Sequence, residues 1–335
     1  MKEFVAMKAQ PSAVSSRRTP VHACPACGGT ARTPWLDAMD YSLVRCGICG
    51  HRYAAEMLAA ECLADIYYAE ADDDLADRSP RAKQARFVEY QAMLDHQGCL
   101  PGRVLDVGCN AGDLLALFSD TGWEVAGVEV SRGPAEYARA RLGVPIWIGP
   151  VEESLPNEER FDLITMTHVL EHLVSPGIVL ARLRAALREG GCLLVEVPNA
   201  DDVQLALWRG FYRPLCPGDH VSFFDAHSLR AVLESAGFSV TETRSPTHAR
   251  DIVYPSLLSA LDWGRSLRRR KASASGVASG GGGVLDQVRY RGRFRAPLRA
   301  AMDRFVEAVD PVVVAATAAL DRARTGPVLV MLARA

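Results

Sequence analysis

Apolar and polar positions alternate along the middle of the chain in a pattern that predicts strands followed by helices. Residues 104–118 (VLDVGCNAGDLLALF) begin with an apolar strand, pass through a glycine-containing turn and end in a helix-compatible run. Further strands are expected at residues 123–129 and 161–173, and residues 182–199 add a helix, a turn and a strand. This order indicates an α/β domain.

Amphipathic segments flank this region. Residues 56–68 are apolar at helical spacing, and residues 81–96 form a second predicted helix that ends before the turn at residues 98–102. We take residues 56–100 as a helical connector. The second helix places three side chains on one face: Phe87, Tyr90 and Leu94. Toward the C-terminus we expect a helix at residues 226–237 and strands at residues 238–244 and 326–335.

Composition and charge add an estimate of the number of domains and of the cellular location of the protein. The chain has 335 residues, 49% of them hydrophobic, which predicts one large domain with a small appendage. Its net charge of −2 gives no general attraction to nucleic acid. The first twenty residues contain no apolar signal core, and no later run is long enough to cross a membrane. We therefore expect a cytoplasmic protein with a disordered segment at residues 1–20.

Two cysteine pairs near the N-terminus predict a metal site. Cys24 and Cys27 form one C-x-x-C turn, and Cys46 and Cys49 form another, at the separation used by zinc ribbons. Four thiolates leave no open coordination position, so we expect a structural zinc in a ribbon at residues 21–55, rather than a catalytic one. His51 could replace one cysteine as a ligand, but we expect it to be an exposed neighbour. The metal would supply folding free energy to so small a module.

The turn after the first strand suggests a cofactor site. Asp106, Gly108 and Gly112 lie where a strand end delivers a ligand to a helix N-terminus. Glu129 ends the next strand about twenty residues later, where a carboxylate can accept hydrogen bonds from ribose hydroxyls. The spacing is not G-x-G-x-x-G, and nothing nearby would hold a pyrophosphate. This argues against a dinucleotide-dependent oxidoreductase.

In the order of these motifs, residues 100–245 and the last strand resemble class I S-adenosylmethionine-dependent methyltransferases. The resemblance implies an α/β fold with a Rossmann-like, seven-stranded methyltransferase sheet, formed by residues 101–250 and 325–335. The zinc-binding module would precede it, and residues 251–324 would form a helical insertion before the last strand. In this family the turn surrounds the methionine portion of S-adenosylmethionine. By matching position, the resemblance implies that Glu129 holds the ribose and that Val151 and Glu152 flank the adenine. The implied cofactor-binding residues are Asp106, Gly108, Asn110, Gly112, Glu129, Val151, Glu152 and His168.

A histidine and glutamate cluster follows the fourth strand. His168, Glu171 and His172 share one face if the segment is helical, and His220 lies further along the chain. These positions resemble those of ubiquinone-pathway O-methyltransferases and small-RNA 2′-O-methyltransferases, in which two glutamates and two histidines bind a divalent ion. His168 replaces the first glutamate here, which shifts the preference from magnesium toward zinc, manganese or iron. A second metal site, a histidine general base without metal and a structural role all stay open. His220 is the first choice as base and His172 the second.

The sequence indicates less about the part of the protein that would bind the methyl acceptor. Residues 205–216 carry aromatic and basic side chains that either contact the acceptor or form the core of a lid: Trp208, Arg209, Phe211, Tyr212 and Arg213. Basic residues and a flexible linker follow within 265–295, which could contact an anionic surface or a lipid-linked substrate, before an apolar helix pair around Pro311. No RNA-binding module accompanies them, so we expect no nucleic-acid partner.

The expected function is therefore O-methylation of a small-molecule acceptor, a sugar or a specialised metabolite, with S-adenosylmethionine as methyl donor and a histidine as base. The donor is already an activated electrophile, so positioning and one deprotonation suffice. Sugar C-methylation and N-methylation are alternatives. A non-catalytic protein that uses the ribbon and the basic insertion as docking surfaces is an alternative of another class.

Overall fold

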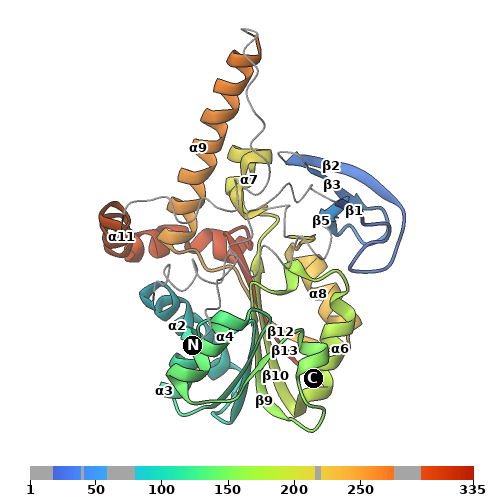
Figure 1. Cartoon of the computed structure of the whole chain (residues 1–335), viewed down its shortest axis with the longest axis vertical. Helices are drawn as coiled ribbons and strands as arrows, with labels where there is room; N and C mark the ends of the chain where they lie inside the picture. The colour runs from blue at the N-terminus through green and yellow to red at the C-terminus, as the bar shows by residue number, and fades with distance from the viewer. Residues whose placement is uncertain (1–17, 39–40, 59–79, 216–219, 275–295) are drawn as a thin grey trace, which may run out of the picture.

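The central sheet of the computed structural model has seven strands in the order β12-β13-β10-β9-β6-β7-β8 (Figure 1). The structure describes residues 18–38, 41–58, 80–215, 220–274 and 296–335. β13 runs antiparallel to both of its neighbours, whereas the five strands from β10 to β8 are parallel. The expected Rossmann-like seven-stranded fold is confirmed. The strands are β6 (Arg103–Val107), β7 (Glu124–Glu129), β8 (Ile146–Ile148), β9 (Phe161–Thr167), β10 (Leu187–Pro198), β12 (Ser239–Arg244) and β13 (Val328–Arg334).

Helices cover both faces of this sheet, as Figure 1 shows. One face packs against α2 (Pro80–His96), α3 (Asp113–Asp120) and α4 (Arg132–Leu142), and the other against α5 (Val151–Ser154), α6 (Pro176–Ala186) and α8 (Ala226–Ser235). Successive side chains of β10 point to opposite faces: Leu194 joins the first layer, whereas Leu193 and Val195 join the second. Two apolar cores therefore fix the sheet from both sides.

The predicted connector helix is confirmed, whereas the helix predicted at residues 56–68 is not. Phe87, Tyr90 and Leu94 of α2 are all buried against the sheet, because spacings of three and four residues place them on one face. Glu56–Leu58 forms a strand, β5, and residues 59–68 lie outside the described part of the chain. β5 pairs with β1 (Arg18–Pro20), so the last three residues of the segment that we predicted to be disordered form a strand, and residues 1–17 lie outside the described residues.

The N-terminal ribbon forms a second sheet, with the strand order β11-β4-β3-β2. β2 (Arg32–Ala38), β3 (Tyr41–Cys46) and β4 (Arg52–Ala54) belong to the ribbon. β11 (Ser222–Phe223) comes from the part of the chain that forms the central sheet and its helices, and it pairs antiparallel with β4. The ribbon is thus joined to the main domain through a shared sheet.

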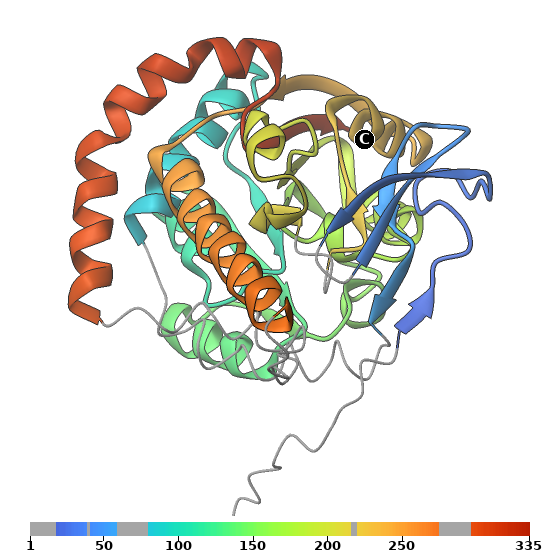
Figure 2. The ribbon, with the colours of Figure 1, turned by 90° about the horizontal axis from the view of Figure 1, so that it is seen from above.

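The C-terminal insertion contains two long helices, α9 (Ala249–Ala274) and α11 (Ala296–Ala323). α9 projects away from the body of the molecule, and α11 curves beside it (Figures 1 and 2). Pro311 lies inside α11, so the expected helix pair around this proline is wrong: the segment is one helix. Residues 275–295 of the predicted linker and basic run lie outside the described residues. In the part of the chain that the structure describes, no helix has the length and apolar character needed to cross a bilayer.

Candidate active site and metal centre

The candidate cofactor residues gather at the carboxyl ends of adjacent parallel strands. β7 and β8 extend the sheet on one side of β6, whereas β9 and β10 extend it on the other, so the order of the strands reverses between β6 and β9. Ligands of open α/β sheets bind at such a switch point. Asp106 lies on β6, Glu129 ends β7 and His168 directly follows β9.

The turn after β6 has backbone dihedral angles that favour glycine and asparagine. Gly108 has a φ of 75°, and a Cβ added there would lie 2.5 Å from Cγ2 of Val169. Asn110 and Gly112 also have positive φ values, of 46° and 76°. Asparagine tolerates this conformation better than most residues, so its presence in place of a glycine does not disturb the turn. The turn therefore approaches the segment after β9 closely.

Glu129 is held at the edge of this turn by backbone donors. The Asn110 and Ser131 amides each donate to one of its carboxylate oxygens, over 2.8 Å in both cases. These amides, with the Ser131 hydroxyl, fix the orientation of the carboxylate at the end of β7. Burial raises the pKa of Glu129, although the hydrogen bonds oppose this effect.

Asp106 is buried beneath the turn. It is 2% exposed, and Oδ1 accepts a 2.8 Å hydrogen bond from the Thr165 hydroxyl. Burial raises the pKa of Asp106 to about 7, because the charged form loses hydration. The remaining predicted cofactor residues follow β8 in α5: Val151 is buried in the core, and Glu152 lies exposed in the first turn of that helix.

His168 lies between two buried carboxylates. Its Nδ1 is 3.3 Å from Oε1 of Glu171, and its Nε2 is 3.1 Å from Oε1 of Glu196. Loss of hydration favours the neutral ring, but the two carboxylates outweigh it and raise the pKa of His168 to about 10. The expected common helical face is wrong, because His168 has a φ of 56° and only Leu170–His172 form a short 3₁₀ turn. The side chains converge through this local backbone instead.

Glu171 is also part of a second cluster, with His172 and His220. One potential ligand atom from each lies within 4.8 Å of the others, and the rings of His172 and His220 meet edge to face with centroids 4.6 Å apart. Nδ1 of His220 is 3.0 Å from the Pro214 carbonyl. A carbonyl only accepts, so Nδ1 carries the proton and Nε2 is the acceptor nitrogen. His168, the fourth predicted member, is directed to the two glutamates instead.

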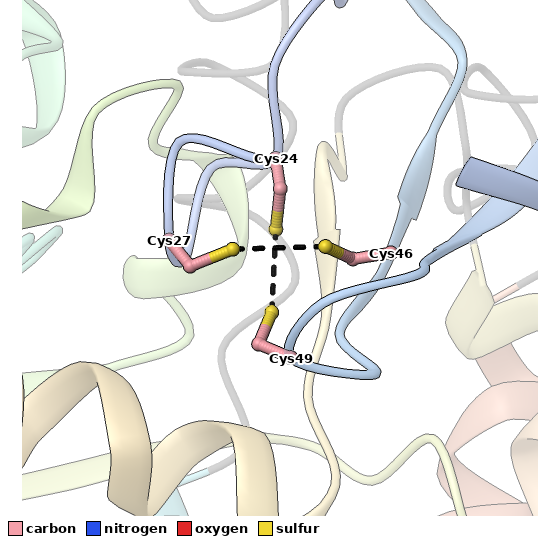
Figure 3. A group of neighbouring side chains, drawn as sticks. All are labelled: Cys24, Cys27, Cys46 and Cys49. Carbon is pink, nitrogen blue, oxygen red and sulfur yellow. Dashed lines mark hydrogen bonds between the residues drawn. The ribbon is translucent and has the colours of Figure 1, made fainter. Parts of the chain in front are cut away.

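The four ribbon cysteines converge on one point, as Figure 3 shows. Their sulfur atoms lie within 4.8 Å of one another, and Sγ of Cys24 is 3.6 Å from that of Cys49, as is Cys27 from Cys46. A tetrahedral zinc with Zn–S bonds of about 2.3 Å requires sulfur atoms about 3.8 Å apart. The Ile48 amide also lies 3.4 Å from Sγ of Cys46. This donor set fits zinc.

His51 is buried, which corrects the expected exposed neighbour. Its exposure is 0%, and its ring lies 4.8 Å from the ring of Phe224 in the main domain. Burial lowers the pKa of His51 to about 4, so the ring is neutral. Among the described residues, the metal-ligating group of the ribbon contains cysteines without this histidine. His51 packs the ribbon against the main domain.

Comparison with known proteins assigns the chain. A family model described as a methyltransferase domain matches residues 49–243, which is more than half of the 335 residues. The chain belongs to this methyltransferase family. The class I assignment from the sequence is therefore confirmed.

Relatives of this methyltransferase are matched over part of their length. The ubiquinone biosynthesis O-methyltransferase of Bradyrhizobium diazoefficiens is 33% identical over 145 residues, 42% of this chain and 54% of that protein. The protein of the same name from Hahella chejuensis is 30% identical over 46% of this chain and 71% of its own. The chain spans about half the length of the first of these curated relatives. A crystal structure of a SAM-dependent methyltransferase from Archaeoglobus fulgidus matches with a TM-score of 0.45 and 16% identity, over 83% of this chain and all of that one.

The methyltransferase also contains a buried polar network that sequence reasoning missed. Arg86 on α2 lies 3.4 Å from Glu196 on β10 and 2.6 Å from Asp251 on α9. The Tyr90 hydroxyl donates to Glu196 over 2.7 Å. Burial opposes ionisation of Glu196, but Arg86, His168 and Tyr90 together lower its pKa to about 2. One signal was present: Glu196 is a lone charge inside the apolar strand LLVEV.

The predicted acceptor-side aromatics are mostly packed against the ribbon. Tyr212 is 1% exposed, and its hydroxyl donates to Asp202. Trp208, at the end of α7 (Val203–Trp208), donates its indole N–H to Ser256 over 3.3 Å. These rings join one apolar cluster with ribbon residues Trp35 and Leu43. Tyr212 is therefore part of the core between the ribbon and the main domain, and the Arg213 side chain lies outside the described part.

The buried Asp106 carboxyl makes the stability of the ligand-free protein depend on pH. Its raised pKa means that its contribution is fully present below pH about 4 and is lost as the pH rises through about 7. We expect Asp106→Asn to raise the free energy of unfolding at pH 8 by about 2 to 4 kcal/mol, with a smaller gain at pH 5. Urea unfolding at both pH values measures this. Asp120→Asn, exposed at the end of α3, is the control; equal gains at both pH values would contradict the prediction.

Proposed function

We propose that this chain transfers a methyl group from S-adenosylmethionine to a hydroxyl of a small-molecule acceptor, a sugar or a specialised metabolite, with His220 as general base. One observation carries the proposal. The cofactor turn contacts the segment that holds the histidine and glutamate cluster, because Gly108 has no room for a Cβ beside Val169. The names of the matched relatives support O-methylation.

The residues at the switch point fit the donor. Glu129 would accept hydrogen bonds from the ribose, the turn from Gly108 to Gly112 would surround the methionine portion, and Val151 and Glu152 would flank the adenine. The donor supplies a methyl group on a positively charged sulfur, which needs no further activation. The protein must position the acceptor and remove one proton. Nε2 of His220 can take the hydroxyl proton, since its Nδ1 proton is engaged by the Pro214 carbonyl.

We further propose one structural zinc ion in the ribbon. The convergence of the four sulfur atoms supports it, and a closed Cys₄ set leaves no position for substrate. A reducing compartment, such as the cytoplasm, suits these thiolates. Contact of residues 265–295 with an anionic surface or a lipid-linked substrate stays a prediction, and the acceptor is proposed to be a small molecule rather than a nucleic acid.

Calorimetric titration with S-adenosylmethionine tests the cofactor site. We expect micromolar binding by the wild type and a loss of about 10- to 100-fold in Glu129→Ala, because a charge-assisted hydrogen bond to the ribose disappears. Glu124→Ala, at the exposed start of the same strand, is the matched control. Failure of the wild type to bind below millimolar concentration would rule out the enzyme and favour a non-catalytic docking protein.

Labelled S-adenosylmethionine identifies the acceptor. Incubating the enzyme with a cell extract and the labelled donor, followed by mass spectrometry, gives the product. A methyl ether supports the proposal, whereas a new carbon–carbon or nitrogen–methyl bond indicates sugar C-methylation or N-methylation.

A second candidate mechanism places a divalent metal at Glu171, His172 and His220. The specific observation in its favour is that the buried Glu171 carboxylate, whose Oε1 lies 3.3 Å from His168, faces the rings of His172 and His220 within metal-binding distance. The charge of His168 argues against a metal. Its Nδ1 lies 3.3 Å from Oε1 of Glu171, so a positive charge occupies the position where a divalent ion would need another anionic ligand.

Metal analysis separates the two mechanisms. With a base alone, we expect about one zinc per chain, held by the cysteines, and activity that added Mg²⁺ or Mn²⁺ does not change. Two ions per chain, with the second lost in Glu171→Gln, together with activation by added metal, would instead establish the metal mechanism. Glu189→Gln, exposed on β10, serves as the control.

A further inference from the structure

The strand that follows His220 belongs to the ribbon sheet. β11 begins two residues after His220 and pairs with β4, Ser222 opposite Tyr53 and Phe223 opposite Arg52. β4 in turn pairs with β3, which ends at the zinc ligand Cys46. A continuous set of backbone hydrogen bonds therefore connects the cysteine cluster to the segment of the proposed base.

Val221 is the point where this connection reaches the active site. Its carbonyl accepts from the Ala54 amide of the ribbon over 2.9 Å, and its own amide donates to the Glu171 carbonyl over 2.8 Å. The Val221 side chain is 1% exposed and packs in the apolar cluster that contains Cys24 and Cys46. The residue next to His220 is thus bonded to the ribbon on one side and to Glu171 on the other.

A zinc ion held by the four cysteines would add to the rigidity of this connection. The apolar cluster around the cysteines consists of few residues, and a second cluster joins the ribbon strands to the main domain, so the knuckles themselves have little apolar support. Binding of zinc to four thiolates supplies the missing free energy. In the zinc-free protein we therefore expect the knuckles, β3 and β4 to be less firmly ordered.

We propose that the zinc of the ribbon is a remote positioning element of the active site: it orders β4, which through Ala54 and Val221 holds His220 and Glu171 in their working arrangement. The zinc ion takes no part in the chemistry. This inference rests on the proposed function of His220, and it predicts that zinc controls methyl transfer without controlling binding of the methyl donor.

Zinc release from the full-length protein, followed by hydrogen exchange, tests the proposal. We expect amide exchange at residues 220–224 to become at least about tenfold faster, while β6 stays protected. Methyl transfer should fall at least about tenfold with the affinity for S-adenosylmethionine unchanged, because small misplacements of a base are costly. Re-addition of one equivalent of zinc should restore both. Unchanged exchange at residues 220–224 after verified zinc release would overturn the proposal.

A second experiment removes the hydrogen bond between Ala54 and Val221 while the zinc stays bound. Ala54→Pro lacks the N–H that bonds Val221, whereas the matched control Ala54→Gly retains it. We expect the proline variant to bind about one zinc and the methyl donor normally, but to transfer methyl groups at least about tenfold more slowly than the glycine variant. Equal rates in two zinc-loaded variants would refute the role of this bond. If the wild type does not bind S-adenosylmethionine, the proposed function fails, and hydrogen exchange still decides the positioning role.

Discussion

Substitution of His220 by alanine is expected to reduce kcat by about 10²- to 10⁴-fold, the usual contribution of a general base. Nε2 is the acceptor nitrogen of this ring, because Nδ1 lies 3.0 Å from the Pro214 carbonyl, and the ring belongs to the cluster that contains Glu171. The affinity for S-adenosylmethionine should stay within about twofold, because His220 is not among the proposed cofactor contacts. Single-turnover transfer of a labelled methyl group and calorimetric titration measure the two quantities.

The histidine at position 227 provides the control for this experiment. It lies exposed in the first turn of α8, seven residues after His220, and His227→Ala should retain full activity. His172→Ala distinguishes the second choice of base, since its ring lies against that of His220. Full activity of His220→Ala, with a large loss in His172→Ala, would reverse the two assignments.

The proximity of the proposed cofactor residues could be predicted from the sequence because its signals are local. Asp106, Gly108 and Gly112 fall within seven residues, and Glu129 ends the next strand, so spacing and strand pattern alone place them together. The cysteine knuckles are equally local. Asn110 follows the same logic, because its positive φ is a property of the turn itself.

Other parts of the site depend on long-range packing that spacing does not reveal. Arg86, Glu196 and Asp251 come from three elements more than fifty residues apart. β11 has only two residues and no apolar alternation to mark it, so its place in the ribbon sheet follows from the fold alone. His51 was misjudged for the same reason: Phe224, which buries it, lies in another domain of the sequence. The predicted helical face failed because local backbone strain at His168 directs its ring to Glu196.

Substitution of Arg86 by methionine is expected to cost about 3 to 5 kcal/mol of stability. The guanidinium is the charge partner of Glu196 and Asp251, and its side chain is only 11% exposed. Its removal takes away the strongest of the interactions that lower the pKa of Glu196 and leaves two buried acidic groups, Glu196 and Asp251, with less compensation. For a domain of this size the melting temperature should fall on the order of 10 °C. Calorimetry or urea unfolding of the metal-loaded protein measures the effect.

The Arg132–Glu136 pair gives the matched comparison, because it joins the same residue types over 3.2 Å on an exposed helix surface. Arg132→Met should cost less than about 0.5 kcal/mol, since exposed helical pairs contribute little. Adding Glu196→Gln to Arg86→Met should recover part of the loss, because a neutral amide can still accept from Tyr90 without leaving a buried charge. Equal losses in Arg86→Met and Arg132→Met would show that the network does not stabilise the fold. No recovery in the double variant would show that packing of the arginine stem, rather than its charge, holds α2 on the sheet.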